Sequence, residues 1–144
     1  MTAVLDHMVG AGGWLWRGVA LSVAVAVSAL PAHAYDLTVP SGQIVTLDEQ
    51  LVVPPDNRIL YLGFTAPSIG GDYAVTFDRA SQDMDQLCEA VGIPEAGRLI
   101  GEGLRIDEVV IRLMERLIPY GEVDPDAAQF LNAYDISGGN CVWM

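Results

Sequence analysis

Two cysteines, Cys88 and Cys141, are the side chains of this sequence best suited to covalent chemistry. In a chain that matures in an oxidising compartment, an even number of cysteines favours a disulfide over free thiols. A bond between the two would close a loop of about 54 residues, which the chain-entropy model values at about 4 kcal/mol of stability. The alternatives are a redox-active thiol, for which the sequence has no Cys-x-x-Cys motif, and two buried free cysteines. We expect a structural disulfide between Cys88 and Cys141.

Histidine and lysine are both missing from residue 35 to the last residue, Met144. Histidine performs most acid–base and nucleophile-activating work, because its pKa lies nearest neutrality. Catalysis by Ser-His-Asp or Cys-His groups is therefore excluded there, and the lack of lysine excludes Schiff-base chemistry and a P-loop. An enzyme built from these residues would need a pair of carboxylates, or a metal ion held by oxygen ligands.

Carboxylates are plentiful, but their spacing indicates a solvated surface rather than a site. Asp85 and Glu89 are four residues apart and share a helix face, whereas Asp83 points in another direction. The sequence has no EF-hand loop, and Asp124-Pro125-Asp126 is more typical of a helix start than of a metal site. Paired acids of the glycosidase type stay open, because a sequence does not give the distance between two carboxyl groups. We assign no catalytic residue, no cofactor and no metal ligand, and we favour a protein that is not an enzyme.

An apolar run near the start of the chain is typical of a secretion signal. Arg17 stands directly before this run, residues 18–30, and Pro31 then ends any helix. A retained membrane anchor is the alternative. The run is shorter than the roughly 20 residues that a bilayer requires, so a removable signal is favoured.

Ala32-His33-Ala34 supplies the small-x-small pattern that a signal peptidase accepts. The pattern predicts cleavage between Ala34 and Tyr35. We therefore expect a signal peptide at residues 1–34 and a periplasmic or secreted protein. Residues 35–144 are enough for one compact acidic domain and too few for two.

The charge of the chain restricts its partners. Of the 19 acidic side chains only Asp6 precedes residue 35, and Arg17 is the only basic one there, so the formal charge of −12 belongs to the expected mature part. Such a field repels nucleic acids and anionic lipids, because phosphate binding needs clustered lysine and arginine. Solubility explains the acidity, and an electrostatic role with a cationic partner is the alternative. We expect an unknown protein or small-molecule partner, no nucleic acid, and no membrane contact after signal removal.

Strands are predicted on both sides of a turn. Residues 43–53 and 58–65 are rich in Val, Ile, Leu and Tyr, and Pro54-Pro55-Asp56-Asn57 lies between them. A third strand is predicted at residues 73–77, and a short final strand at residues 140–143. The final strand would hold Cys141.

Helical spacing occurs twice in the second half of the chain. Asp78 can cap a helix that Gly92 and Pro94 end, and Cys88 lies on its apolar face. A second helix is predicted to begin at Asp124, with the following proline in its first turn. Its apolar positions would be Ala127, Ala128, Leu131 and Tyr134. Residues 95–103, rich in glycine, predict a mobile loop.

Residues 108–120 fit two structures. Val109, Val110, Leu113, Met114, Leu117 and Ile118 have helical spacing, and alternate residues of the same segment fit one face of a strand. The periodicity alone slightly prefers the helix. It leaves the choice open.

The sequence resembles a family of small exported alphaproteobacterial proteins with no established function. The resemblance lies in Val39-Pro40-Ser41-Gly42-Gln43, Asp83-Met84-x-x-Leu87-Cys88, residues 109–121, Asn132-Ala133-Tyr134 and Cys141-Val142-Trp143. Relatives carry proline within the segment corresponding to residues 109–121, so the resemblance implies a strand there. Some are labelled acetolactate synthase, which we reject, because that activity needs thiamine diphosphate and a Gly-Asp-Gly to Asn-Asn segment that this sequence lacks.

These observations together predict an α+β domain with a small, mixed and mainly antiparallel sheet of about five strands and two helices packed on it. The predicted function is that of a non-catalytic binding or interaction module outside the cytoplasm. A hydrolase that uses paired carboxylates or calcium is the alternative. The oligomeric state and the partner are not given by the sequence.

Overall fold

The computed structural model describes residues 35–72 and 74–144 of the chain. The predicted signal segment, including Ala34 on one side of the cleavage position, lies outside the described residues. The described part holds six strands, a 3-10 turn and a helical segment. In chain order these are β1 (Asp36–Thr38), β2 (Ile44–Val53), β3 (Ile59–Thr65), η1 (Pro67–Ile69), α1 (Phe77–Leu87), η2 (Cys88–Gly92), α2 (Ile93–Gly101), β4 (Glu108–Met114), β5 (Gln129–Asp135) and β6 (Val142–Trp143).

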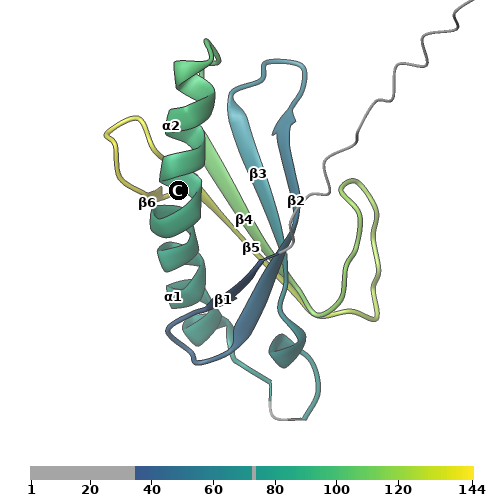
Figure 1. Ribbon diagram of the computed structural model, residues 1–144. Coiled ribbons are helices and arrows are strands. Elements are labelled where there is room, and N and C mark those ends of the chain that lie inside the picture. Colours follow the sequence, from purple (N-terminus) through teal and green to yellow (C-terminus); the bar gives the residue numbers. More distant parts are fainter. Residues whose placement is uncertain (1–34, 73) are drawn as a thin grey trace, which may run out of the picture. The chain divides into compact units, whose positions relative to one another are not determined.

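The strands form one sheet in the order β1-β2-β3-β4-β5-β6. Every neighbouring pair is antiparallel except β3 and β4, which are parallel. Parallel neighbours need a long crossover, and α1, η2 and α2 supply it. Figure 1 shows this helical segment along one side of the sheet. The architecture is α+β with a mixed, mainly antiparallel sheet, as predicted, although the sheet has six strands rather than five.

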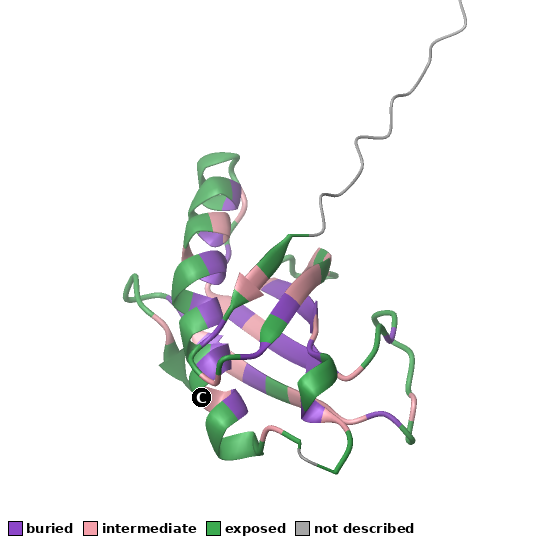
Figure 2. Ribbon diagram, turned by 60° about the horizontal axis from the view of Figure 1, so that its bottom comes forward, coloured by how far each residue is buried: buried purple, intermediate pink, exposed green. Residues whose placement is uncertain are grey.

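The main core lies between the helical segment and the sheet. Successive side chains of a strand face opposite sides, so alternate residues of β3 and β4 point towards the helix. Figure 2 shows the buried residues where helix and strands face each other. The largest fully buried members of this core are Tyr134, Phe64, Leu60, Leu62, Met84 and Leu87.

The helix does not end at Gly92 and Pro94, and this prediction is wrong. A π-helical turn, η2, joins α1 to α2 without a break, so one continuous helix runs from Phe77 to Gly101. Pro94 falls in the first turn of α2, where a missing backbone N–H is tolerated. Most of the predicted mobile loop, residues 95–103, is therefore helix.

The second predicted helix, beginning at Asp124, is also wrong. Residues 124–128 are turn and irregular structure, and the chain then enters β5. All seven residues of β5 pair with β4. This ladder overrides the local helical spacing, because strand formation depends on a partner distant in sequence.

The predicted strand at residues 73–77 is not formed in its described part. Residues 74–76 have no regular structure, and α1 begins at Phe77 with Thr76, not Asp78, in the N-cap position. The open choice for residues 108–120 is settled in favour of the strand as far as Met114. The parallel pairing with β3 and the antiparallel pairing with β5 make β4 a central strand.

Candidate binding surface

The side of the sheet away from the helical segment is only partly covered, and we call it the open face. Residues directly opposite each other on paired strands share a face. The pairing register therefore places three neighbouring rows of four residues from β2 to β5 on the open face, namely Glu49, Gly63 and Arg112 and nine further residues. The nine are Leu51, Val53, Ile59, Tyr61, Glu108, Val110, Leu131, Ala133 and Asp135.

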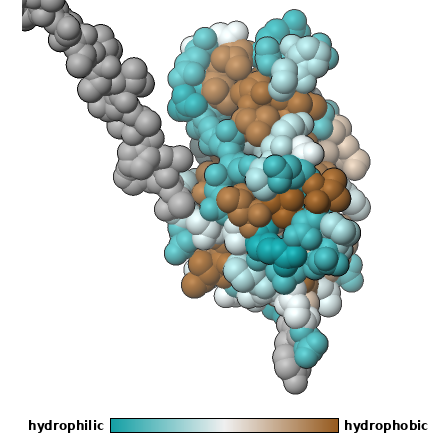
Figure 3. Space-filling view, turned by 90° about the vertical axis from the view of Figure 1, so that its right-hand side faces the viewer, coloured by the Kyte–Doolittle hydropathy of each residue, from teal (hydrophilic) through white to brown (hydrophobic). Residues whose placement is uncertain are grey.

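Most apolar side chains of the open face are in partial contact with solvent. Leu51, Val53, Ile59 and Val110 are half-buried, and Leu131 is 55 % exposed. Figure 3 views the molecule from this side and shows hydrophobic surface divided by hydrophilic side chains. An apolar sheet face that is left partly exposed is typical of an interaction surface.

A hollow of about 270 Å³ lies at the end of the open face where the β2–β3 turn meets the start of β4. We call it the hairpin hollow. Its apolar wall consists of Val53, Pro54, Pro55 and Ile59, and its charged members are Asp56, Arg58, Asp107 and Glu108. Arg58 forms an ion pair with Asp107. The lining of the hairpin hollow therefore combines apolar side chains with a net negative charge.

Two acidic residues are pairing partners on neighbouring strands beside the hairpin hollow. Glu108 on β4 is directly opposite Asp135 on β5. Like charges in this arrangement destabilise a sheet. The Ser137 backbone amide donates a hydrogen bond to Asp135 Oδ1 at 2.7 Å, and hydrogen bonds from Ser137 hold the pKa of Asp135 below its ordinary value. Asp135 therefore stays ionised next to Glu108.

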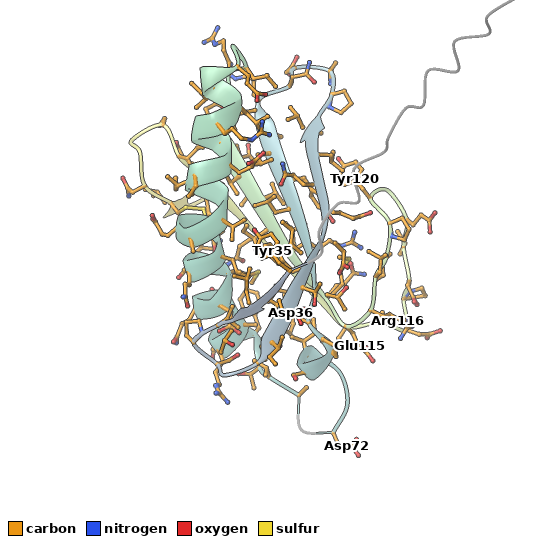
Figure 4. All side chains as sticks on the ribbon, viewed as in Figure 1. Tyr35, Asp36, Asp72, Glu115, Arg116 and Tyr120 are labelled. Carbon is orange, nitrogen blue, oxygen red and sulfur yellow. A yellow bond between two sulfur atoms is a disulfide. The ribbon has the colours of Figure 1, made fainter. Side chains whose placement is uncertain are left out.

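The connection between β4 and β5, residues 115–128, covers the other end of the open face. Its Ile118 packs against Met114 in a small second core. Tyr120 meets the Tyr61 ring edge to face, with 4.8 Å between ring centroids, and its backbone amide donates to Glu49 Oε1 at 3.1 Å. In Figure 4 the labelled Tyr120 lies on the same connection as Glu115 and Arg116, which are labelled near its beginning.

Arg112 is the buried charge beneath this connection, and it is 8 % exposed. Its Nη2 donates to Gln129 Oε1 at 2.6 Å, and its Nη1 donates to the Tyr61 hydroxyl at 3.2 Å and to the Ile118 carbonyl at 3.3 Å. All three acceptors are neutral. Since the donors of Arg112 point to the protein itself, the guanidinium fastens the connection to β4.

Gly63 makes room for two polar groups beside Arg112. A Cβ on Gly63 would lie 3.1 Å from the Tyr61 hydroxyl and 3.2 Å from Glu49 Oε2. Glu49 Oε2 is buried and has no hydrogen-bond partner among the described residues. Burial raises the pKa of Tyr61, and the hydrogen bond from Arg112 opposes this rise. Tyr61 is therefore protonated at neutral pH, and we assign this cluster a structural role.

Asp83 is a fully buried carboxylate that ties the helix to the turn between β1 and β2. It accepts hydrogen bonds from the Ser41 amide at 2.8 Å, the Ser41 hydroxyl at 2.6 Å and Gln43 Nε2 at 2.7 Å. The prediction of a solvated role is wrong for Asp83 and holds for Asp85 and Glu89, which are exposed. These hydrogen bonds explain the presence of Ser41 and Gln43 in the sequence motif at residues 39–43.

A second set of polar contacts ties the helix to β5. Asn132 Nδ2 donates to Ser81 Oγ and to the Tyr134 hydroxyl, both at 3.2 Å, and that hydroxyl donates to Asp85 Oδ1 at 2.7 Å. Burial is the main cause of a strongly raised pKa of Tyr134, and Asp85 adds to it. The Asn132-Ala133-Tyr134 motif is therefore structural.

Cys88 and Cys141 are joined by a disulfide in the structure, in agreement with the predicted pairing. The bond links η2 to the segment before β6. The Cys141 amide also donates to Glu89 Oε1 at 2.7 Å. The helix and the end of the chain are therefore connected covalently and by a hydrogen bond.

A second hollow of about 410 Å³ lies between β2 and α2. Val91 belongs to its apolar lining, and Gln50, Glu95 and Arg98 to its polar lining. Arg98 Nε donates to Glu95 Oε2 at 2.9 Å, and Gln50 Nε2 donates to Glu95 Oε1 at 2.5 Å. The pKa of Glu95 is lowered, chiefly by the hydrogen bond from Arg98. Since these groups already pair with one another, we assign no ligand to this hollow.

Two further observations on the described residues concern metal binding and membrane spanning. Within residues 35–72 and 74–144, His, Cys, Asp and Glu side chains form no group of three or more that could hold a metal ion. None of the helices in this part of the chain combines the length and apolarity of a membrane span. Hydrogen bonds lower the pKa of three carboxyl groups in the described part of the chain: Glu95, Asp124 and Asp135.

The sequence did not indicate the hairpin hollow. The sequence pattern indicates only a turn at residues 54–57 and only an ambiguous segment at residues 108–120. The parallel pairing of Ile59 with Glu108 brings the two together. The one signal in the sequence is a turn that contains two prolines and an aspartate, residues 54–57. Tyr35, at the predicted cleavage position, is 43 % exposed.

The comparisons with known proteins give one match. The model of a family described as "Family of unknown function (DUF6497)" matches residues 19–144. No curated protein and no solved structure matches the chain.

Proposed function

The chain belongs to this family of unknown function, and we propose from its own structure that it is a non-catalytic binding module that works outside the cytoplasm. The observation that carries the proposal is the open face. It presents half-buried apolar side chains next to a hollow, while Arg112 and Asp83 are engaged inside the protein. Such a surface needs no catalytic group to bind a partner.

Export is supported by the leader pattern at residues 18–34 and by the disulfide. Stable disulfides are typical of oxidising compartments. The test is the intact mass of the protein recovered from the periplasm and medium of its own cells. We expect a chain that begins at Tyr35. Recovery of the full-length chain in the cytosol, with Met1 still attached, would contradict export.

Binding on the open face is tested by photo-crosslinking in the cells that produce the protein. A benzoyl-phenylalanine replaces Leu131 on the open face, and in a matched control it replaces Gln86, which is exposed on the helix. We expect a discrete adduct from position 131 and none from position 86. Equal yields from both positions, or no adduct from either, would contradict a binding role for the open face.

A hydrolase based on carboxylates is the second candidate, because the hairpin hollow gathers Asp56, Asp107 and Glu108. Acid catalysis by such a pair requires one carboxyl group with a raised pKa. Asp107 is engaged by Arg58 and is therefore not free to act as one member of such a pair. A calorimetric titration with calcium tests the metal-dependent form of this alternative, and binding heat would favour it over the module.

A further inference from the structure

The chemistry of the partner is indicated by the charges of the hairpin hollow. Three carboxylates and one arginine line it. Arg58 is engaged by Asp107, and within the described residues no basic side chain forms an ion pair with Asp56 or Glu108. Asp135 adds a further negative charge opposite Glu108. A cation placed here would meet a net negative charge.

The apolar wall of the hollow restricts the form of that cation. Val53, Pro54 and Ile59 offer apolar surface next to the acids. An arginine or lysine side chain matches this arrangement, because its aliphatic stem packs on apolar surface while its charged head stays near water. A bare metal ion has no such stem. The described residues also offer no group of three metal-ligating side chains.

The size of the hollow favours a side chain over a whole small molecule. Its volume of about 270 Å³ is below the roughly 300–1,000 Å³ of small-molecule sites. The half-buried apolar residues Leu51, Val110 and Ala133 continue from the hollow across the open face. The occupant is therefore larger than the hollow and apolar beyond the charged group.

We propose that the open face binds a segment of a partner protein in which an arginine or lysine is followed at alternate positions by apolar residues, with the basic side chain seated in the hairpin hollow. The proposal rests on the proposed function, since it names the partner of the same face. An extended segment fits best, because its side chains alternate in direction and one row, basic at one end and apolar beyond it, can lie along the face. The formal charge of −12 attracts such a segment from a distance.

The test uses the oxidised, isotope-labelled protein and a defined probe, the peptide acetyl-Arg-Ser-Val-Ser-Val-Ser-amide, in which arginine and the two valines share one side of an extended chain. Amide chemical shifts are followed by NMR during titration at low salt. We expect shifts at Ile59, Asp107, Glu108 and Val110. We also expect a dissociation constant about fivefold or more larger in 0.5 M NaCl, since salt screens exposed charges. The double variant Asp56→Asn/Glu108→Gln should weaken binding to a similar extent. A matched control, Asp72→Asn/Glu122→Gln, removes two exposed carboxylates outside the hollow and should leave the hollow shifts in place.

Two peptide controls separate this proposal from the proposed function. In one control peptide glutamate replaces the arginine of the probe, and in the other serine replaces it. If the serine peptide binds the open face as well as the arginine peptide does, the face is a binding surface but its partner is not cationic. Absence of shifts at the hollow with the arginine peptide, or shifts that survive both salt and the double variant, would overturn the cationic partner. The crosslinking at position 131 then still decides the binding role.

Discussion

At the scale of single residues, most polar groups that attract attention in the sequence hold the fold together. Asp83 and Tyr134 are both almost completely buried, and each is satisfied by hydrogen bonds between the helix and another element. Arg112 performs the same work between β4 and the connection that follows it. Buried polar groups of this kind fix one arrangement of the elements, because any other arrangement leaves them without partners.

We predict that Asp83→Asn lowers the free energy of unfolding by about 2–4 kcal/mol, because an amide in place of the carboxylate meets three donors and loses charged hydrogen bonds. Gln82→Ala, an exposed change on the same helix, serves as the control and should have little effect. Urea unfolding of both variants measures the difference. Equal stability of the two variants would mean that the contacts of Asp83 with Ser41 and Gln43 contribute nothing.

The two tyrosines with raised pKa values predict how stability depends on alkaline pH. Tyr61 and Tyr134 keep their protons in the folded state at a pH where an unfolded chain, with a tyrosine pKa of about 10, loses them. Above about pH 10 the folded state binds more protons than the unfolded state, so stability falls, by at most about 1.4 kcal/mol per pH unit for each group. The chain has no lysine to obscure this. Urea unfolding at pH 8, 10 and 11 tests it, and an unchanged midpoint would contradict burial of these hydroxyls.

At the scale of elements, the continuous helix is the feature that organises the molecule. It makes the parallel pairing of β3 and β4 possible, and that pairing creates the hairpin hollow. Gly92 lets the helix approach the sheet, because a Cβ there would lie 2.9 Å from Val109 Cγ1. Gly97 in the same helix has no atom within 4 Å of the corresponding position.

The two glycines form a matched pair for a prediction. Gly97→Ala should raise the free energy of unfolding by up to about 1 kcal/mol, because alanine has the higher helix propensity. Gly92→Ala gains the same propensity but overpacks the contact with Val109, which typically destabilises by about 1–3 kcal/mol. We expect Gly92→Ala to be the less stable variant by that amount in thermal or urea unfolding. The opposite order would show that the helix can move away from β4.

The disulfide is the second tie between elements. Breaking it, by reduction or by the double variant Cys88→Ser/Cys141→Ser, should lower the free energy of unfolding by about 4 kcal/mol, because the loop of about 54 residues is no longer closed in the unfolded chain. Intact mass with and without reduction, followed by alkylation, establishes the bond first. Two thiols that alkylate in native, unreduced protein would contradict it.

At the scale of the whole molecule, the excess of negative charge opposes compactness. The formal charge of −12 gives self-repulsion that salt screens, since the Debye length falls from about 30 Å at 0.01 M to about 8 Å at 0.15 M. The melting temperature should therefore rise by a few degrees between 10 and 300 mM NaCl, as about 1 kcal/mol shifts it by about 4–8 °C in a domain of this size. The variant Asp72→Asn/Glu122→Gln should show a smaller rise. A melting temperature that falls with salt would mean that the exposed ion pairs of Arg58, Arg98 and Arg116 outweigh the repulsion.

The sequence by itself determined the local features of this protein: the β2–β3 hairpin with its proline-rich turn, the apolar face of α1, the cysteine pairing, and a formal net charge of −12. These depend on neighbouring residues or on counts, which a sequence contains directly. Only the tertiary structure decided that the helix continues past Gly92, that residues 129–135 are a strand, and that Asp56 and Glu108 share one hollow. Each of these depends on contacts between segments far apart in the chain, because strand pairing and close packing against Val109 have no local signature.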